Sequence, residues 1–157
     1  NMAYMSQKGY DTLVAKLQKM ESVDRLAASA AIAEARDKGD LSENAEYDAA
    51  KEAQGKLETE IAMLKQTIRE AKIIDPKSID TSVVNILATV GLKNVKNKMA
   101  MKYTIVSETE ANLREGKISI GTPIAKGLLG KKVGDVASIK VPQGMVELEI
   151  TSIDYDL

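Results

Sequence analysis

Carboxylate side chains are concentrated in one short part of this sequence. The stretch from residue 34 to residue 52 holds seven acidic residues and three basic ones, namely Glu34, Asp37, Asp40, Glu43, Glu46, Asp48 and Glu52 against Arg36, Lys38 and Lys51. Such oxygen ligands suit Mg²⁺, which takes carboxylates while keeping several of its waters. Because Asp40 and Glu43 alone are too few to cage a six-coordinate ion, we expect tight binding only if a partner supplies further ligands.

The same acids also have a purely structural interpretation. Aspartate favours turns, and an acid in the first turn of a helix interacts favourably with the helix dipole by about 0.3–1 kcal/mol. Against this, the clustered acids repel one another, and Ser42 alone could cap a following helix. Arg36, Lys51 and Tyr47 likewise fit ordinary ion pairing and packing. On residue types alone, both interpretations stay open.

Composition limits the chemistry of the 157-residue chain. Without cysteine or histidine it has no disulfides, no thiolate ligands and not the usual general base. The net charge is −1, so an anionic partner must be recognised locally. No segment approaches the roughly 20 apolar residues of a membrane span, and no secretory pattern is present at the start, which predicts a cytoplasmic protein without a membrane partner. Its only aromatic residues are five tyrosines, which predicts an aliphatic core.

The acidic stretch lies inside a long helical region. Residues 10–72 contain no proline, and good helix formers prevail. Apolar residues recur at every third or fourth position in two stripes, which are Tyr10, Leu13, Leu17, Met20, Ala28, Ala31, Ile32 and Ala35, and then Ala50, Ala53, Leu57, Ile61, Leu64, Ile68 and Ala71. Between the stripes, Gly39 could end one helix and Ser42 could cap the next. We therefore expect residues 1–76 to form a long antiparallel coiled-coil hairpin with an acidic tip.

Beyond Pro76, which ends the second helix, the pattern changes to alternation and β-branched runs. Four strands are predicted, at residues 82–90, 99–106, 136–141 and 145–153. The sequence Pro142-Gln-Gly144 predicts a turn between the last two, and Thr122 with Pro123 predicts the start of a short helix. The fold class is therefore α+β, with residues 77–157 as a small antiparallel β-sheet domain.

Two separate stretches resemble one known family. Residues 31–52, which contain the sequence Gly-Asp-Leu-Ser-Glu-Asn-Ala-Glu-Tyr, closely resemble the hairpin tip of the bacterial Gre transcript-cleavage factors. The sequence Thr122-Pro-Ile-Ala-Lys-Gly-Leu-Leu-Gly-Lys131 resembles the signature of that family's C-terminal domain. The resemblance covers essentially the whole chain, and the two motifs occur in the order expected of the family.

The resemblance implies a coiled coil inserted through the secondary channel of RNA polymerase, and an FKBP-like C-terminal domain that docks at the channel rim. It implies that Asp40 and Glu43 help to hold a second Mg²⁺ shared with the polymerase active site, where backtracked nascent RNA is cut by water. The factor would lend ligands without being an enzyme itself, and it would bind no cofactor tightly alone. Further contacts with RNA or polymerase at the tip fall to Asn44, Tyr47, Lys51 and Arg36. The docking motif comprises Thr122, Pro123, Ile124, Ala125, Lys126 and Gly127.

The sequence departs from the family pattern in two places. Residues 23–29 lack the Arg-Pro-Glu pattern expected there, and residues 91–101 are more basic than expected. The hairpin itself lacks the basic character that would favour long extruded RNA, so we expect short cleavage products. We also expect the factor to be monomeric.

Three alternative functions remain open at this point. One is an inhibitor of the same fold that plugs the polymerase channel. Another is a peptidyl-prolyl isomerase or chaperone, although Tyr103 and Tyr155 are the only aromatic side chains that the C-terminal half offers to a proline pocket. The last is a coiled-coil adaptor without catalytic consequence.

Overall fold

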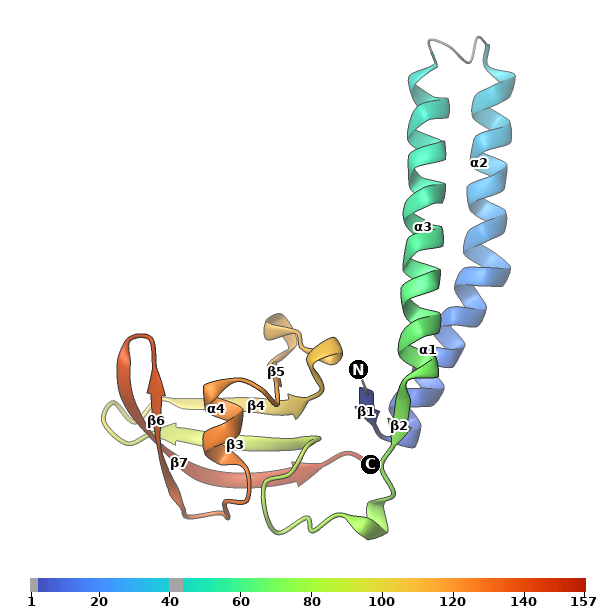
Figure 1. Cartoon of the computed structure of the whole chain (residues 1–157). Helices are drawn as coiled ribbons and strands as arrows, with labels where there is room; N and C mark the ends of the chain where they lie inside the picture. Colours follow the sequence, from blue (N-terminus) through green and yellow to red (C-terminus); the bar gives the residue numbers. More distant parts are fainter. Residues whose placement is uncertain (1–2, 40–43) are drawn as a thin grey trace. The chain divides into compact units, whose positions relative to one another are not determined.

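The computed structural model describes residues 3–39 and 44–157, and the chain divides into two compact units (Figure 1). The hairpin unit consists of Gly9–Glu70. The sheet unit combines Asn1–Lys8 with Ala71–Leu157, so the first residues of the chain belong with its C-terminal part. None of the described helices is long and apolar enough to cross a membrane.

The hairpin unit is built from two helical arms. Its elements are α1 (Gln7–Lys19), a π-helical turn (Met20–Asp24), α2 (Arg25–Asp37) and α3 (Ala45–Arg69). Glu21 pairs with Lys65 at 3.1 Å, and Arg25 pairs with Glu58 at 2.7 Å. Because the partner's number falls as the first number rises, α3 runs antiparallel to the first arm. The predicted antiparallel helical hairpin is confirmed.

Few side chains of the hairpin are fully buried, as expected for two helices without a third layer. The buried apolar residues of the described arms are Met20, Ile32, Ala35 and Ile61, and all four lie in the two predicted stripes. The π-helical turn was not predicted. Its five residues continue the helical backbone between α1 and α2, with Met20 buried at its start.

The sheet unit contains a two-stranded and a five-stranded sheet. The strands are β1 (Ala3–Met5), β2 (Ala71–Ile73), β3 (Ala88–Asn94), β4 (Ala100–Val106), β5 (Lys117–Ser119), β6 (Val136–Val141) and β7 (Gly144–Tyr155). β1 pairs with β2 in parallel, and the larger sheet has the order β5-β4-β3-β7-β6. Its central pairs are antiparallel, but β5 runs parallel to β4. The larger sheet is therefore mostly antiparallel, as predicted, and β5 is a parallel strand at its edge.

The strand predicted at residues 82–90 is wrong in its bounds, because β3 begins only at Ala88 and continues to Asn94. The preceding Leu87 has a φ of 76°, a left-handed conformation that interrupts extended backbone. By contrast, β6 matches its predicted range, and Val141 pairs with Gly144 across the predicted turn. β6 and β7 form a local hairpin, and both its turn and the alternation of its strands are visible in the sequence.

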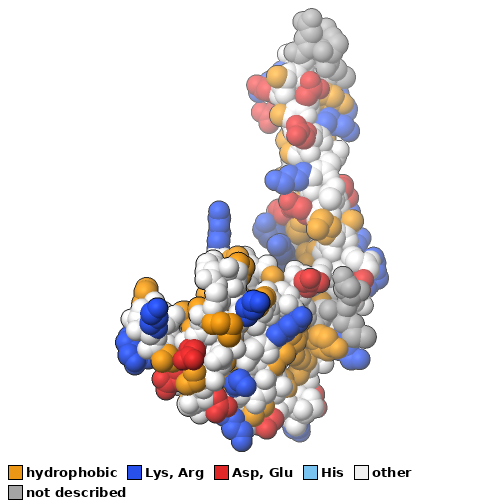
Figure 2. All heavy atoms as spheres, turned by 60° about the vertical axis from the view of Figure 1, so that its left-hand side comes forward, with side chains coloured by type: hydrophobic (Ala, Val, Ile, Leu, Met, Phe, Trp, Pro, Cys, Tyr) orange, Lys and Arg blue, Asp and Glu red, His pale blue; other side chains and the backbone are white. Residues whose placement is uncertain are grey.

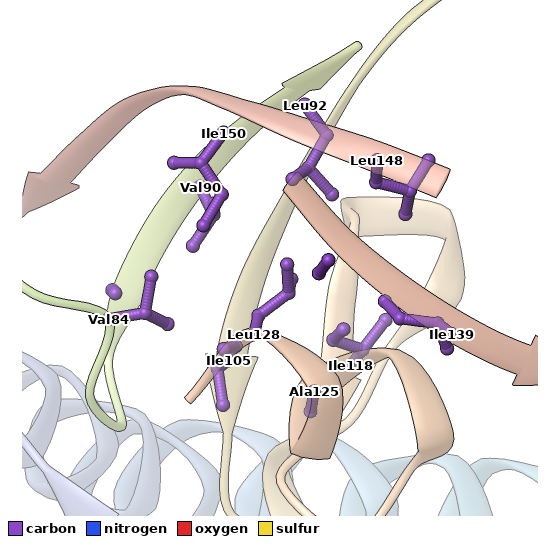
Figure 3. Close-up of a cluster of buried hydrophobic side chains, with 12 residues drawn as sticks. Val84, Val90, Leu92, Ile105, Ile118, Ala125, Leu128, Ile139, Leu148 and Ile150 are labelled. Carbon is purple, nitrogen blue, oxygen red and sulfur yellow. The ribbon is translucent and has the colours of Figure 1, made fainter. Parts of the chain in front are cut away.

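The core of the sheet unit is aliphatic, as predicted (Figure 3). The short helix α4 (Pro123–Leu128) places Ala125 and Leu128 against side chains from the sheet, and both are fully buried. Gly127 allows this close approach, because a Cβ there would lie 2.6 Å from Cγ1 of Ile139. The helix is thus held on one face of the sheet by residues of the predicted docking motif.

Candidate functional site

The hairpin end, which comprises residues 34–39 and 44–52, is fastened by one asparagine. The side-chain amide of Asn44 donates to the carbonyl of Ala35 at 2.6 Å, and its oxygen accepts from the backbone N–H of Tyr47 at 3.1 Å. Asn44 is therefore the N-cap of α3 and also links α3 to the last turn of α2. Asn44 thus takes the capping role that the sequence suggested for Ser42, a residue that lies outside the described ones.

The two predicted metal ligands, Asp40 and Glu43, lie outside the described residues, as does Ser42. They belong to the segment that joins Gly39 to Asn44. The structure therefore specifies the two ends between which this segment runs, because the bond from Asn44 to Ala35 brings the end of α2 and the start of α3 together.

The described flanks of this segment carry more acidic than basic side chains, and Figure 2 shows both kinds near the grey tip. Their exposed carboxylates are Glu34, Asp37, Glu46, Asp48 and Glu52. Lys38 pairs with Glu46 at 2.8 Å. The hydrogen bond to Glu46, its charge and the charge of Glu34 together raise the pKa of the Lys38 ammonium. One of the three local cations is thus engaged by an acid of the same cluster.

The remaining predicted contact residues differ in how accessible they are. Arg36 and Lys51 are exposed on the hairpin end, and the Lys51 ammonium contacts the side-chain oxygen of Gln54 at 3.5 Å. Tyr47 is half-buried, and its backbone N–H is used by the cap. The structure therefore brings Asn44 and Tyr47 together, while Arg36 and Lys51 present charged groups to solvent.

The donor set at the hairpin end fits a hard cation. Carboxylates are the most numerous ligand type among its described residues, and they suit Mg²⁺ and not thiophilic metals. Within residues 3–39 and 44–157, no three acidic side chains gather closely enough to hold an ion. Any site that uses Asp40 and Glu43 would draw on the undescribed segment.

The predicted docking motif around α4 has a clear structural role. The Thr122 hydroxyl accepts from the Ala125 N–H at 3.2 Å and donates to the Ser119 carbonyl at 2.8 Å, so the predicted cap is confirmed. Pro123 occupies the first turn of the helix, as predicted. Of the motif residues, Pro123 and Lys126 are exposed, whereas Ala125 is buried and Ile124 packs against the core.

A groove of about 680 Å³ in the sheet unit lies beside this motif and was not predicted from the sequence. Its apolar lining comes mainly from isoleucines and one leucine, namely Ile74, Ile79, Ile86, Ile120 and Leu129. Tyr4, Ser78, Asp80 and Asn85 complete the lining. The isoleucines between residues 74 and 86 were the only sequence signal for this groove, but the same residues are equally typical of a β-strand.

Comparison with known proteins identifies the class to which this fold and this hairpin end belong. Residues 3–73 match the family described as "Transcription elongation factor, N-terminal", and residues 79–155 match "Transcription elongation factor, GreA/GreB, C-term". The chain therefore belongs to the GreA/GreB family of transcription elongation factors. The resemblance found in the two sequence motifs is confirmed.

Individual relatives agree with this assignment. The chain is 53% identical over 152 residues to transcription elongation factor GreA of Flavobacterium johnsoniae, covering 97% of this chain and 96% of the relative. It is 49% identical over 154 residues to GreA of Amoebophilus asiaticus, covering 98% of both chains. Among solved structures, the GreA factor homolog Gfh1 of Thermus thermophilus is 25% identical with a TM-score of 0.47, covering 98% of this chain and 99% of that one.

Proposed function

We propose that this protein binds RNA polymerase, inserts its hairpin through the secondary channel and stimulates the polymerase to cut backtracked nascent RNA, releasing short 3′ fragments. The observation that carries the proposal is the hairpin end. There, Asn44 holds the two arms together on either side of Asp40 and Glu43, in a chain that belongs to the GreA/GreB family.

The hairpin is long enough to extend into a channel. At 1.5 Å per residue, the 25 residues of α3 extend for about 38 Å. Such a narrow element, with few fully buried side chains, can carry two carboxylates into a channel that excludes a globular domain. In this proposal residues 1–76 deliver the acids, and residues 77–157 dock on the polymerase. The protein acts as a monomer in the cytoplasm.

The chemistry belongs to the polymerase, and the factor completes its metal site. Asp40 and Glu43 would hold a second Mg²⁺ together with carboxylates of the polymerase. The ion, when bound, lowers the pKa of a coordinated water so that it can attack a phosphodiester at neutral pH. This accounts for activity without a histidine base. The factor is then not an enzyme by itself and needs no tightly bound cofactor of its own.

The other residues at the hairpin end take positioning roles. Arg36 and Lys51 are exposed and can pair with RNA phosphates or acidic polymerase side chains. Asn44 and Tyr47 fix the start of α3, from which Lys51 projects. In the sheet unit, Pro123 and Lys126 are the exposed members of the docking motif, and the neighbouring groove offers an apolar surface for the polymerase.

A cleavage assay on stalled complexes tests the proposal. Backtracked elongation complexes with end-labelled RNA are incubated with the wild-type factor or with the double variant Asp40→Asn, Glu43→Gln. The wild type should shorten the RNA, and the double variant should bind polymerase without doing so. Asp48→Asn with Glu52→Gln is the matched control, because it removes the same charge from exposed positions nearby and should retain cleavage.

Two outcomes would contradict the proposal. If the wild type releases no shortened RNA while nucleotide addition slows, the protein is a channel-plugging inhibitor. If the double variant cleaves as well as the wild type, the two acids are not ligands in the reaction.

A further inference from the structure

The strands β3 and β4 and their connection carry four lysines and no acidic residue. No acidic residue occurs in the sequence from residue 81 to residue 107, whereas Lys93, Lys96, Lys98 and Lys102 fall within it. Lys96, Lys98 and Lys102 are exposed, and Lys93 is half-buried. Within the described part of the chain, none of the four lies within 4.0 Å of a carboxylate oxygen.

The turn that presents two of these lysines is held by its own hydrogen bonds. The side-chain oxygen of Asn94 accepts from the backbone N–H of Lys96 at 2.9 Å and of Asn97 at 3.2 Å. The backbone N–H of Lys98 donates to the Asn94 carbonyl at 2.8 Å, and Asn97 accepts from Met99 at 2.9 Å. Because the turn is already ordered, little conformational entropy is lost when a partner binds it.

Lys98 has a backbone conformation that lysine rarely adopts. Its φ is 65°, in the left-handed region where glycine or asparagine costs less than a lysine. The backbone of the turn does not explain why a lysine occupies this position. The reason must therefore lie in the lysine side chain.

Strand register shows which face of the sheet the third lysine occupies. Lys102 pairs with Gly91, which has no side chain, and its neighbours Met101 and Tyr103 pack against the core. Lys102 therefore points from the face opposite the core. Lys93 contributes less, because it pairs in register with Glu149 of β7. The lysine hairpin is therefore defined as Lys96, Lys98 and Lys102, the three exposed lysines of β3, β4 and their connection.

We propose that the lysine hairpin binds the phosphate backbone of duplex nucleic acid. Protein interfaces favour arginine and are depleted in lysine, whereas lysine serves well as a point charge toward phosphate. Sites for single strands rely on exposed aromatic rings that stack on bases. The one aromatic residue of β3 and β4, Tyr103, packs against the core instead. A turn at the end of the sheet that presents lysines without a stacking surface suits the phosphates of a duplex.

This inference is independent of the cleavage function, and its first test needs no polymerase. Anisotropy of a labelled DNA duplex of about 20 base pairs is measured with the full chain from about 50 mM salt upward, where each phosphate contact contributes about 0.9 to the slope of log affinity against log salt. The triple variant K96Q/K98Q/K102Q should bind more weakly, and its slope should fall by about 2.7. The matched control K77Q/K132Q/K140Q removes three exposed lysines of the same unit and should keep the wild-type slope.

Lys98→Gly separates charge from folding, because glycine suits the positive φ and should not destabilise the turn. Its slope should fall by about 0.9 while its melting temperature is maintained or raised. The proposal is overturned if the wild type does not bind the duplex at low salt, or if both triple variants lose affinity equally. It is also overturned if K96Q/K98Q/K102Q keeps duplex binding but loses affinity for polymerase free of nucleic acid, since the occupant would then be an acidic protein surface.

Discussion

Replacing Asn44 should loosen the hairpin end without unfolding the rest of the hairpin. Asn44→Ala removes an N-cap bond to Tyr47 and a bond to the Ala35 carbonyl. Loss of a cap costs about 1 kcal/mol, and loss of a typical net hydrogen bond costs about another 1 kcal/mol. The sum of about 2 kcal/mol corresponds to roughly a 30-fold change in a local opening equilibrium.

Amide hydrogen exchange measures this opening directly. In Asn44→Ala, the Tyr47 amide should exchange about 30-fold faster than in the wild type, whereas the amide of the buried Ile61 should be unaffected because it lies far along α3. Asn44→Asp is the matched variant. Its carboxylate can still accept from Tyr47 but cannot donate to Ala35, so the acceleration should be intermediate, at roughly fivefold.

The functional counterpart follows from the same geometry. If Asn44 positions the segment that carries Asp40 and Glu43, Asn44→Ala should reduce RNA cleavage more than it reduces polymerase binding. The reasoning is refuted if Tyr47 exchange in Asn44→Ala equals that of the wild type. It is equally refuted if Ile61 accelerates as much as Tyr47, since the effect would then be global.

Two further predictions concern the sheet unit. Gly127→Ala should lower the free energy of unfolding by about 1–3 kcal/mol, because the new Cβ would lie 2.6 Å from Ile139. Gly121→Ala is the control, because the nearest atom to its new Cβ is 3.7 Å away, and it should leave the thermal melt unchanged. Burial raises the pKa of the Tyr155 phenol, whose oxygen also accepts a hydrogen bond from the Asn85 N–H. The neutral phenol therefore stabilises the fold below about pH 10, and this contribution is lost as the pH rises through the raised pKa. Tyr155→Phe should therefore flatten the alkaline fall in stability measured by denaturant titration, and an unchanged fall would contradict the assignment.

The helical hairpin was predictable because its signals are local. Spacing, the absence of proline and helix-forming residues all act within a few turns, and the stripes correctly contained the buried Met20 and Ile61. The π-helical turn was not predictable on these grounds. Its residues are ordinary helix formers, and the wider turn changes which side chains face α3, so it depends on packing between residues more than thirty positions apart.

The sheet shows the same division between local and distant signals. β6 and β7 were predicted well because a short turn joins them. The short strands β1, β2 and β5 were missed, since three residues carry little pattern and each strand exists through a distant partner. The Tyr4 N–H, for example, donates to the buried Ser107 hydroxyl 103 positions away. No local feature of Tyr4 indicates that contact.

The identity of the cap changes how the acidic cluster is interpreted. Had Ser42 been the cap, Glu43 would be the first helical residue, and its charge would be explained by the helix dipole alone. With Asn44 as the cap, the first turn of α3 contains Glu46 and Asp48, which meet that structural need. In the sequence, Glu43 precedes the cap and Asp40 follows the end of α2, so neither acid belongs to the first turn of α3. The acids of that first turn are therefore different residues from the two carboxylates that the metal-ligand hypothesis needs.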